Sequence, residues 1–405
     1  MYIQRHIVSA LNRLKRSFPS VLVTGARQTG KTTLLKENAD GSGIISFDDY
    51  IQYSAVKQDA IGFVKSLTPP VILDEVQYAP EVFRPLKLCI DNEQINGAYL
   101  MTGSQKFELM KGVSESLAGR IGILTLLGLS EREINGIDFT TPFLPASEYI
   151  NSRRSTAVPI STSDLWVRIQ RGSFPKLYAD MKIEPYEFYS AYVTTYIERD
   201  VRALSQVGDE LTFMQFLTAC AARTASILNL SDICKDVGIS SPTAKRWLSI
   251  LQASGIVYLL QPFSLNVSAR VIKTPKLYFL DTGLTAYLCK WLTPATLENG
   301  AMSGAFFETY VVGEIIKSYR NAGMEPPIYY YRDVDKREVD VLFYLDGSLH
   351  PLEIKKTASP NVYDAKHFEV LNRIETVNIQ QGGIVCMYDN PLRLGDRQII
   401  PVNML

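Results

Sequence analysis

One motif in the sequence has the residue types and the spacing that suit the binding of a phosphate chain. The apolar segment 21–23 and Thr24 run directly into the pattern G-x-x-x-x-G-K-T, which is followed by a helix-length stretch. Glycines in this pattern let backbone N–H groups turn inward around phosphates, and the N-terminus of the following helix adds a favourable dipole. We expect Lys31 to reach the β- and γ-phosphates and Thr32 to bind Mg²⁺. The motif therefore predicts a site for ATP and Mg²⁺ formed by Gly25, Ala26, Arg27, Gln28, Thr29, Gly30, Lys31, Thr32 and Thr33.

A second motif supplies the acidic groups that a bound Mg²⁺ and an attacking water need. The apolar residues 71–73 lead into Asp74 and Glu75, with a further apolar segment at 44–47 between the two motifs. We expect Asp74 to hold Mg²⁺ through water and Glu75 to act as the catalytic base. On its own, an apolar run that ends in Asp-Glu also fits a strand that meets a solvated turn, and the upstream motif favours the catalytic interpretation.

Two further polar residues are candidates for this site, each with a structural alternative. Thr102 follows the apolar segment 98–101 and could sense the γ-phosphate from a neighbouring strand. It could equally belong to a capped turn, because Ser and Thr favour helix N-caps. Arg120 could act as a catalytic arginine finger on a neighbouring molecule's nucleotide, or it could form a salt bridge within the chain.

Carboxylates and a lysine in the last quarter of the sequence form another group with chemical potential. The segments 339–345 and 349–356 flank Asp346-Gly347, which favours a two-residue hairpin turn. Such a turn places Asp340 opposite Glu353. Directly opposed Cβ atoms lie roughly 5 Å apart, and like charges at that separation repel.

A divalent cation held by Asp340 and Glu353 would relieve this repulsion, and carboxylate ligands suit Mg²⁺ or Mn²⁺. Lys355, on the same face of the strand as Glu353, could position or activate a water for attack on a phosphodiester. Glu308, on a helix predicted to begin near Gly304, is a candidate further ligand. The alternative is a solvated strand face whose charges are neutralised by neighbouring lysines and arginines, and the spacing alone favours neither.

The elements that must position the phosphate-binding residues alternate along residues 1–140. An amphipathic helix around Leu11 comes first, and helix-length stretches separate most of the later apolar segments. This alternation is typical of a parallel sheet covered by helices, and we predict the α/β sheet of a P-loop NTPase. The predicted strands lie at about 21–24, 44–47, 71–74, 98–102 and 122–127.

Two further domains are predicted, at 141–262 and at 263–405. The first begins with a Ser-, Thr- and Pro-rich linker at 141–163 and continues as helices. Residues 230–248 fit a helix-turn-helix with its turn at Gly238, and 256–260 would form a wing strand, as in a winged helix. Lys245 and Arg246 are only two charges on the second helix, so DNA contact and a structural connector remain alternatives.

Composition limits the remaining choices. The 405 residues fit two or three domains, and 46% apolar with 21% charged residues describes a folded chain. Lys plus Arg equals Asp plus Glu at 42 each, so no overall positive field favours nucleic acid, and a local basic patch stays open. Five scattered cysteines and three histidines lack the spacing of a zinc site. We find no signal-peptide core and no apolar run long enough to span a bilayer, so we expect a cytoplasmic location without a membrane partner.

Taken together, the motifs resemble those of a prokaryotic AAA-type ATPase family with a C-terminal domain of unknown function, DUF4143. The similarity covers nearly the whole chain. The stretches that carry it are 25–32, 73–77, 102–105, 116–120, 196–200 and 276–284.

This resemblance implies a P-loop module, a winged-helix-like middle and a C-terminal α/β domain similar to the PD-(D/E)XK (restriction-endonuclease-like) nucleases. Asp340, Glu353 and Lys355 match the nuclease motif, Glu308 matches its helix carboxylate, and Val339 replaces its proline. We therefore predict an ATPase that controls a nucleic-acid-directed, nuclease-like module acting on DNA or RNA. The alternatives are a regulatory switch that binds a protein partner through a catalytically silent C-terminal domain, and a homo-oligomeric motor in which Arg120 acts in trans.

Overall fold

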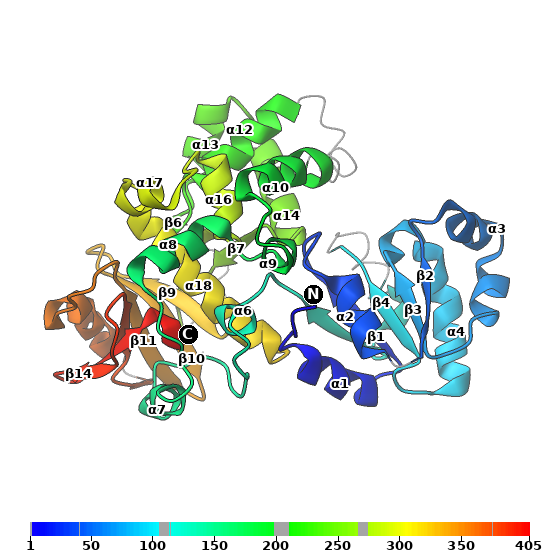
Figure 1. Ribbon diagram of the computed structural model, residues 1–405, viewed down its shortest axis with the longest axis horizontal. Helices are drawn as coiled ribbons and strands as arrows, with labels where there is room; N and C mark the ends of the chain where they lie inside the picture. Colours follow the sequence, from blue (N-terminus) through cyan, green and yellow to red (C-terminus); the bar gives the residue numbers. More distant parts are fainter. Residues whose placement is uncertain are drawn as a thin grey trace.

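The computed structural model describes residues 2–39, 41–104, 113, 115–197, 210–265, 274–374 and 376–405. Residues 105 and 198–200, which belong to two of the motifs above, lie outside the described residues. The chain forms an α/β region at one end, a mostly helical region and a second sheet region (Figure 1).

The first region is built on a parallel sheet of five strands in the order β2-β3-β4-β1-β5. Strands β1, β3 and β4 are buried along their whole length, which explains their unbroken apolar runs. The strands are β1 (Ser20–Thr24), β2 (Gly43–Ser46), β3 (Val71–Asp74), β4 (Tyr99–Thr102) and β5 (Ile121–Thr125). The predicted parallel sheet is confirmed, and each strand lies within two residues of its predicted position.

Helices cover both faces of this sheet. Successive residues of a strand point to opposite faces, so Leu22 packs with Phe83 of α4 while Val21 and Val23 pack with Leu11 of α1 and Leu34 of α2. The helices are α1 (Val8–Ser17), α2 (Lys31–Asn38), α3 (Tyr50–Lys65) and α4 (Phe83–Glu93). Because all strands run the same way, the ends of β1, β3 and β4 bring the phosphate-binding motif, Asp74 and Thr102 to one edge of the sheet.

The middle region contains a small antiparallel sheet in the order β6-β8-β7 with helices around it, while its first helices, within residues 131–153, pack against the C-terminal part of the chain. Its aromatic core includes Phe213 and Phe216, which pack against Trp247. The elements are α6 (Glu131–Ile134), α7 (Ser147–Arg153), α8 (Thr162–Arg171), α9 (Pro175–Ala179), α10 (Pro185–Tyr192), the π-helix η3 (Val193–Ile197), α12 (Glu210–Ala221), β6 (Ser226–Ile227), α13 (Leu230–Val237), α14 (Ser241–Ala253), β7 (Val257–Leu260), β8 (Lys276–Phe279), α16 (Thr282–Leu288) and α17 (Pro294–Asn299).

Two features of this region bear on the sequence-based expectations. The helices α13 and α14 flank a left-handed Gly238, as the helix-turn-helix pattern predicts, and the assignment as a winged helix stays a prediction. The segment 141–163 is not wholly a linker, since it contains α7. The domain boundaries also stay predictions. The predicted boundary between residues 262 and 263 would separate β8 from β6 and β7, with which it pairs, whereas a boundary after α17 would keep this sheet together.

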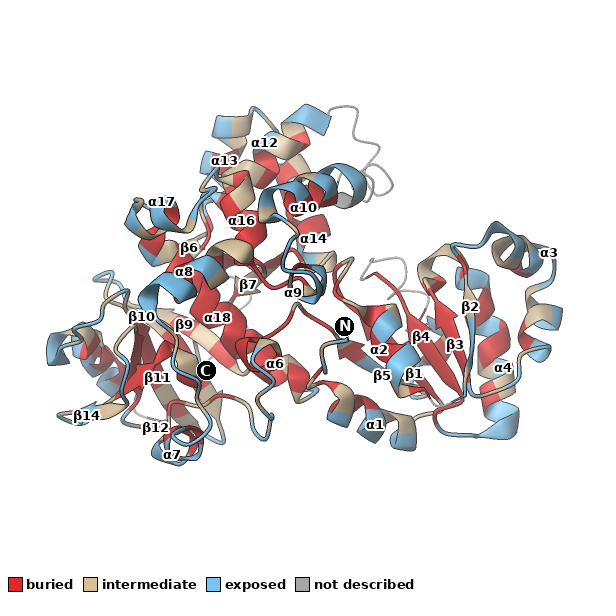
Figure 2. Cartoon of the chain, viewed as in Figure 1, coloured by how far each residue is buried: buried red, intermediate tan, exposed pale blue. Residues whose placement is uncertain are grey.

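The third region is a mixed sheet in the order β14-β15-β13-β11-β10-β9, with α18 against one face and η4 against the other. Figure 2 shows the inner strands of both large sheets, and most of α18, as buried, whereas the edge strands β2 and β14 are partly exposed. The elements are α18 (Ser303–Asn321), β9 (Ile328–Arg332), β10 (Glu338–Leu345), β11 (Ser348–Ile354), the 3-10 helix η4 (Val362–Arg373), β12 (Asn378–Ile379), β13 (Gly383–Cys386), β14 (Leu392–Leu394), β15 (Arg397–Pro401) and η5 (Val402–Met404).

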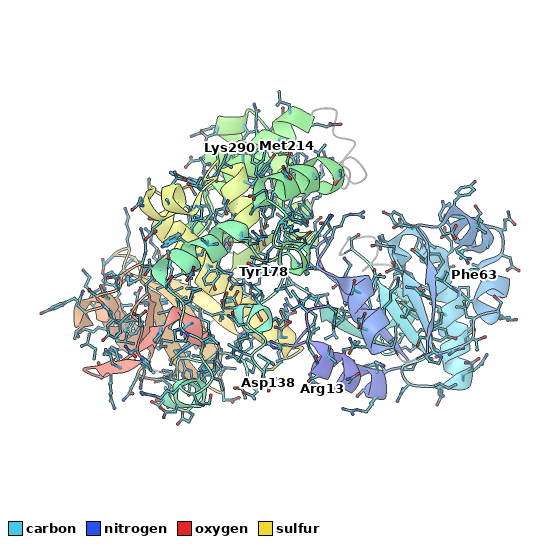
Figure 3. The ribbon with its side chains drawn as sticks, viewed as in Figure 1. Arg13, Phe63, Asp138, Tyr178, Met214 and Lys290 are labelled. Carbon is cyan, nitrogen blue, oxygen red and sulfur yellow. The ribbon has the colours of Figure 1, made fainter. Side chains whose placement is uncertain are left out.

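The first and third regions meet at α18. Arg13 on α1, labelled in Figure 3, donates a hydrogen bond to the Ala322 carbonyl at the end of α18 (2.8 Å). The segment that follows β5, residues 126–133, also reaches α18: Glu131 N–H donates to Glu314 (2.9 Å), and Lys317 donates to the Leu129 carbonyl (3.0 Å). We call residues 126–133 the connecting segment. Among the described residues, no helix is both long and apolar enough to cross a membrane.

Candidate functional site

The phosphate-binding loop starts where β1 ends, and two of its residues must be glycine. Gly25 has a φ of +142°, and a Cβ there would lie 2.1 Å from the Leu126 carbonyl oxygen. Gly30 has a φ of 90° and caps α2 in the left-handed conformation. Glycine alone adopts both conformations without a steric penalty, so the loop turns sharply and the N-terminus of α2 begins immediately after it.

Lys31 is the first residue of α2, and its side chain folds back over the loop. The ammonium group donates to the carbonyl oxygens of Gly25 (3.1 Å) and Ala26 (2.9 Å), and the residue is buried. The lysine charge and the N-terminus of α2 therefore lie at the same loop, an arrangement that attracts an anion.

Asp74 gathers hydroxyl groups from three neighbouring elements. The Thr32 hydroxyl donates to Asp74 Oδ1 at 2.7 Å, Thr102 donates to the same oxygen, and Ser46 Oγ lies 3.5 Å from Oδ2. A carboxylate beside a hydroxyl at the start of a helix offers the hard oxygen ligands that Mg²⁺ prefers. The chemistry of these residues fits the predicted Mg²⁺, and Thr32 and Asp74 would be its protein ligands.

Glu75 has an unusual backbone conformation for a residue with a side chain. Its φ of 56° and ψ of 44° are left-handed. Its N–H donates to Thr102 Oγ1 (3.1 Å), and its carboxylate accepts a hydrogen bond from the Gln77 side chain. A non-glycine residue keeps a left-handed backbone conformation only where the surrounding structure enforces it, and such residues are frequent at functional sites. Thr102 thus contacts both acidic residues and positions the backbone between them.

The remaining residues of the phosphate-binding motif do not contact Asp74 or Glu75 in the described hydrogen bonds, and each has its own environment. Arg27 donates to the Tyr78 hydroxyl (3.1 Å), and Thr33 is exposed. Gln28 has a φ of 62°, and its Oε1 is buried without a hydrogen-bond partner among the described residues. Ala26 lies against the middle region, because a Cβ on Gly255 would be only 3.3 Å from the Ala26 nitrogen. The loop is therefore in contact with the turn between α14 and β7.

Arg120 makes a salt bridge within the chain. Its guanidinium donates to both carboxylate oxygens of Asp91 on α4, at 2.5 and 3.0 Å. Its carbonyl accepts from Ser20, the first residue of β1, so Arg120 lies at the edge of the sheet opposite the phosphate-binding loop. It therefore lies away from the loop of its own chain, and a finger role would require a second molecule.

The C-terminal carboxylates converge as the hairpin pattern predicts. Val341 pairs with Leu352 and Leu345 with Ser348, the register that places Asp340 opposite Glu353. The strand β10 has a register shift between Val339 and Leu342, at Asp340. Such bulges re-aim side chains next to functional sites.

Two lysines are inserted among these carboxylates. Lys355 donates to Glu353 (2.9 Å) and lies 3.7 Å from Asp340. Lys276, whose side chain is 3% exposed, lies 2.9 Å from Glu308 and 2.7 Å from Glu338. Sequence spacing did not single out Lys276, although it begins one of the family-like stretches. Among the described residues, no three His, Cys, Asp or Glu side chains lie close enough together to hold a metal ion.

The charges in this cluster perturb one another strongly. Burial, together with the facing Asp340, raises the pKa of Glu353 well above its ordinary value, and burial also raises the pKa of Glu308. Burial opposes ionisation of Asp340, but the hydrogen bond from Glu353 and the two lysines lower its pKa overall. At a pH between these two pKa values the pair holds one proton, which resides on Glu353.

A cavity of about 1180 Å³ lies between the N-terminal residues, the connecting segment and α8. Arg5, Glu133 and Arg168 are among its lining residues, and so are Asp138 and Tyr178, which Figure 3 labels between the first region and the rest of the chain. Tyr178 is stacked under the Arg168 guanidinium at 5.2 Å. The sequence motifs did not single out any of these residues.

Three family models match successive parts of the chain. Residues 17–135 match the AAA domain family, 162–295 match a domain of unknown function (DUF8612), and 303–405 match the domain of unknown function DUF4143. With the parallel sheet and its phosphate-binding loop, the first match defines an AAA-type P-loop ATPase domain. The chain thus carries an AAA domain and a DUF4143 domain.

Two mycobacterial proteins are similar to most of this chain. The uncharacterized protein Rv2008c of Mycobacterium tuberculosis is 28% identical over 366 residues, which cover 89% of this chain and 76% of that protein. The uncharacterized protein Mb2031c of Mycobacterium bovis gives the same values.

Solved structures show weaker likeness. A Walker-type ATPase of Pyrococcus abyssi has a TM-score of 0.47 and 15% identity, over 71% of this chain and 96% of that one. RuvB of Thermotoga maritima has a TM-score of 0.29 and 17% identity, over 62% of this chain and 86% of that one.

The pKa of Glu353 predicts a stability effect with a definite sign. Because the folded protein binds this proton more tightly than the unfolded chain, its stabilising contribution is complete below pH 4.5 and is lost as the pH rises toward the folded-state pKa. Glu353→Gln, which is neutral at every pH, should therefore gain stability over the wild type as the pH rises above 4.5, by about 1.4 kcal/mol per pH unit at most, until the pH passes the folded-state pKa of Glu353. Urea unfolding of both proteins at each pH measures this difference.

Glu369→Gln, on an exposed part of η4, is the control and should show no such trend. A difference between Glu353→Gln and the wild type that does not change with pH would contradict the assignment of the shared proton to Glu353.

Proposed function

We propose that this chain binds and hydrolyses MgATP in its AAA domain and that the nucleotide state controls a nucleic-acid-directed C-terminal module. The observation that carries the first part is the pairing of Thr32 with Asp74 at 2.7 Å beside the loop closed by Gly25 and Gly30. One side chain comes from the loop's helix and the other from the end of a different strand. Their meeting point is where an ion bound to the terminal phosphates would lie.

Each residue of the site then has a distinct role. Lys31 and the N–H groups of the loop would bind the phosphate oxygens, and Thr32 and Asp74 would hold Mg²⁺, which would supply charge neutralisation at the phosphates. Glu75 follows Asp74 directly and would accept a proton from the attacking water. Thr102, bonded to Asp74 and to the Glu75 N–H, responds to any change at either residue.

Control of the C-terminal domain needs a physical route, and the connecting segment supports one. Leu126 packs on Gly25 and donates a backbone hydrogen bond to Thr24 (2.8 Å). Five residues later, Glu131 is bonded to α18. The same helix carries Glu308 two turns before Glu314, so a shift of the loop reaches the carboxylate cluster through one helix.

Substitutions in the AAA domain should separate binding from hydrolysis. Lys31→Ala should abolish ATP binding, because it removes the charge that contacts the phosphates. Glu75→Gln should retain ATP binding but lower the turnover number about 100-fold or more, because the general base is lost. Both are measured by equilibrium ATP binding and by phosphate release, with and without DNA.

Glu81→Gln is the matched control, since Glu81 is an acidic residue nearby that pairs with Lys57 at the surface. Wild-type turnover in Glu75→Gln, or tight ATP binding by Lys31→Ala, would contradict the proposed roles. Turnover that rises with DNA would support a nucleic-acid-coupled enzyme.

For the C-terminal module, the convergence of Asp340, Glu353, Lys355 and the Glu308 helix supports a nuclease-like site. The repulsion between Asp340 and Glu353 is now relieved by a shared proton, and a divalent cation could take that role when it displaces the proton. Lys355, whose side chain is 37% exposed, is the member of the cluster that can reach a substrate phosphate.

One observation favours the alternative, a switch with a catalytically silent C-terminal domain that binds a protein partner. Lys276 is buried between Glu308 and Glu338, so a positive charge already pairs with Glu308, one of the carboxylates that a metal would use. A cation in this position would have to compete with a lysine that burial and two ion pairs hold in place.

A cleavage assay decides between these two functions. Single-stranded DNA and plasmid DNA are incubated with the protein, ATP and Mg²⁺ or Mn²⁺. The nuclease-like function predicts cleavage that Asp340→Ala abolishes and Asp335→Ala preserves, because Asp335 is an exposed acid that only pairs with Arg337. Absence of cleavage by the wild type under every condition would reject the nuclease and support the switch.

A homo-oligomer is compatible with both functions. Arg120 lies at the edge of the sheet away from its own loop, so it can contribute to catalysis only at the loop of a neighbouring molecule. In that case Arg120 must give up its salt bridge with Asp91 and contact a phosphate instead. Exposed salt bridges contribute little to stability, so this exchange costs little.

A further inference from the structure

Arg5 lies behind the phosphate-binding loop, outside every motif that the sequence suggested. Its side chain is 4% exposed and pairs with Glu133 at 3.0 Å. One guanidinium nitrogen donates to the carbonyl oxygen of Thr29 in the loop at 2.9 Å. The other terminal nitrogen donates to the carbonyls of Leu127 (2.7 Å) and Gly128 (3.2 Å) in the connecting segment.

The bond to Thr29 fixes the orientation of one peptide unit of the loop. The peptide between Thr29 and Gly30 is trans, so its C=O and its N–H point in opposite directions. When Arg5 holds the Thr29 carbonyl, the Gly30 N–H must point away from Arg5. This N–H belongs to the residue that caps α2, where phosphate-binding loops direct their donors to the anion.

Free rotation of this peptide is otherwise easy, because Gly30 lacks a side chain that would restrict it. Gly30 has a left-handed φ of 90°, and it has no Cβ whose steric contacts would restrict its backbone conformation. The Thr29 hydroxyl does not hold the peptide either, since it donates to the Ala26 carbonyl instead (2.9 Å). Among the described contacts, the hydrogen bond from Arg5 is thus the one that sets the direction of the Gly30 N–H.

Arg5 is itself held rigidly. The Glu133 carboxylate that pairs with it also accepts hydrogen bonds from the backbone N–H groups of His6 (2.8 Å) and Ser130 (2.8 Å). Burial would raise the pKa of Glu133, but Arg5 and these N–H groups lower it, so the carboxylate stays ionised. An ionised partner fixed by the backbone leaves the guanidinium with one orientation.

We propose that Arg5 is a positioning residue for nucleotide binding, which orients the Thr29–Gly30 peptide so that the Gly30 N–H donates to a phosphate of ATP. The proposal rests on the proposed function of the loop as an ATP site. Arg5 does not touch the nucleotide itself. Its effect must therefore depend on the phosphates and not on the adenosine part of the ligand.

The test compares Arg5→Met and Arg5→Lys with the wild type in the full chain. Equilibrium binding of MgATP, ADP and adenosine is measured by competition against a fluorescent ATP analogue. Arg5→Met should bind ATP and ADP about tenfold more weakly or worse, because a charge-assisted hydrogen bond is lost, while its affinity for adenosine stays the same. Arg5→Lys, which can still donate to one carbonyl, should recover part of the affinity. In steady-state turnover, KM should rise by about the same factor and kcat should change little.

A control separates this effect from general destabilisation, because Arg5 also stabilises the connecting segment. Arg153→Met removes another buried arginine, whose Nε donates to the Met404 carbonyl (3.4 Å) in the C-terminal region. Thermal unfolding should show a lower melting temperature for both Met variants. Only Arg5→Met should lose affinity for ATP.

Equal ATP affinity in Arg5→Met and the wild type would overturn the proposal. So would an equal loss of ATP and adenosine affinity, or a loss in Arg153→Met as large as that in Arg5→Met. If Arg5→Met does not fold, the absence of any phosphate-dependent change in Arg5→Lys overturns it. A wild-type protein that does not bind MgATP at all would reject the proposed function of the loop, and with it this inference.

Discussion

The close approach of Gly25 to the backbone of Leu126 is the contact on which the arrangement of the site depends. It brings the end of β1, and hence the phosphate-binding loop, against the start of the connecting segment. From there the chain passes Arg5 and reaches α18, where the Glu131 N–H donates to Glu314 and Lys317 donates to the Leu129 carbonyl. A single stretch of backbone thus contacts the loop at one end and the C-terminal helix at the other. Any side chain at position 25 would separate them.

Beyond α18, the burial of charged side chains determines the properties of the C-terminal carboxylate cluster. Carboxylates that are removed from water must be protonated, paired or bound to a cation. Here both of the first two solutions occur: Glu353 keeps a proton against Asp340, and Lys276 pairs with Glu308 and Glu338. A metal ion at this cluster would therefore have to compete with a proton and with lysines that already lie among the carboxylates.

The sequence predicted those parts of the site whose residues are close in the chain or repeat with a regular period. The glycine-lysine loop follows its strand directly, Asp74 ends an apolar run, and the register of the β10–β11 hairpin follows from the two-residue turn. It did not predict Arg5 or Lys276, because their partners Glu133 and Glu308 lie 128 and 32 residues away. A local sequence pattern cannot indicate pairs so far apart in the chain. The packing of the connecting segment brings Arg5 to Glu133, and the packing of α18 brings Lys276 to Glu308. The helix α7 was missed for a different reason, since its polar, Ser- and Pro-flanked sequence fits a linker equally well.

The central claim is that nucleotide at the loop and structure at α18 are connected through residues 126–133. Hydrogen exchange of the full chain, measured by mass spectrometry with and without MgATP, tests it most directly. We predict slower exchange at the loop (residues 25–33), and a change that continues through the connecting segment into α18. Protection confined to the loop would contradict the connection, and an exchange pattern that does not respond to MgATP anywhere would contradict the nucleotide site itself.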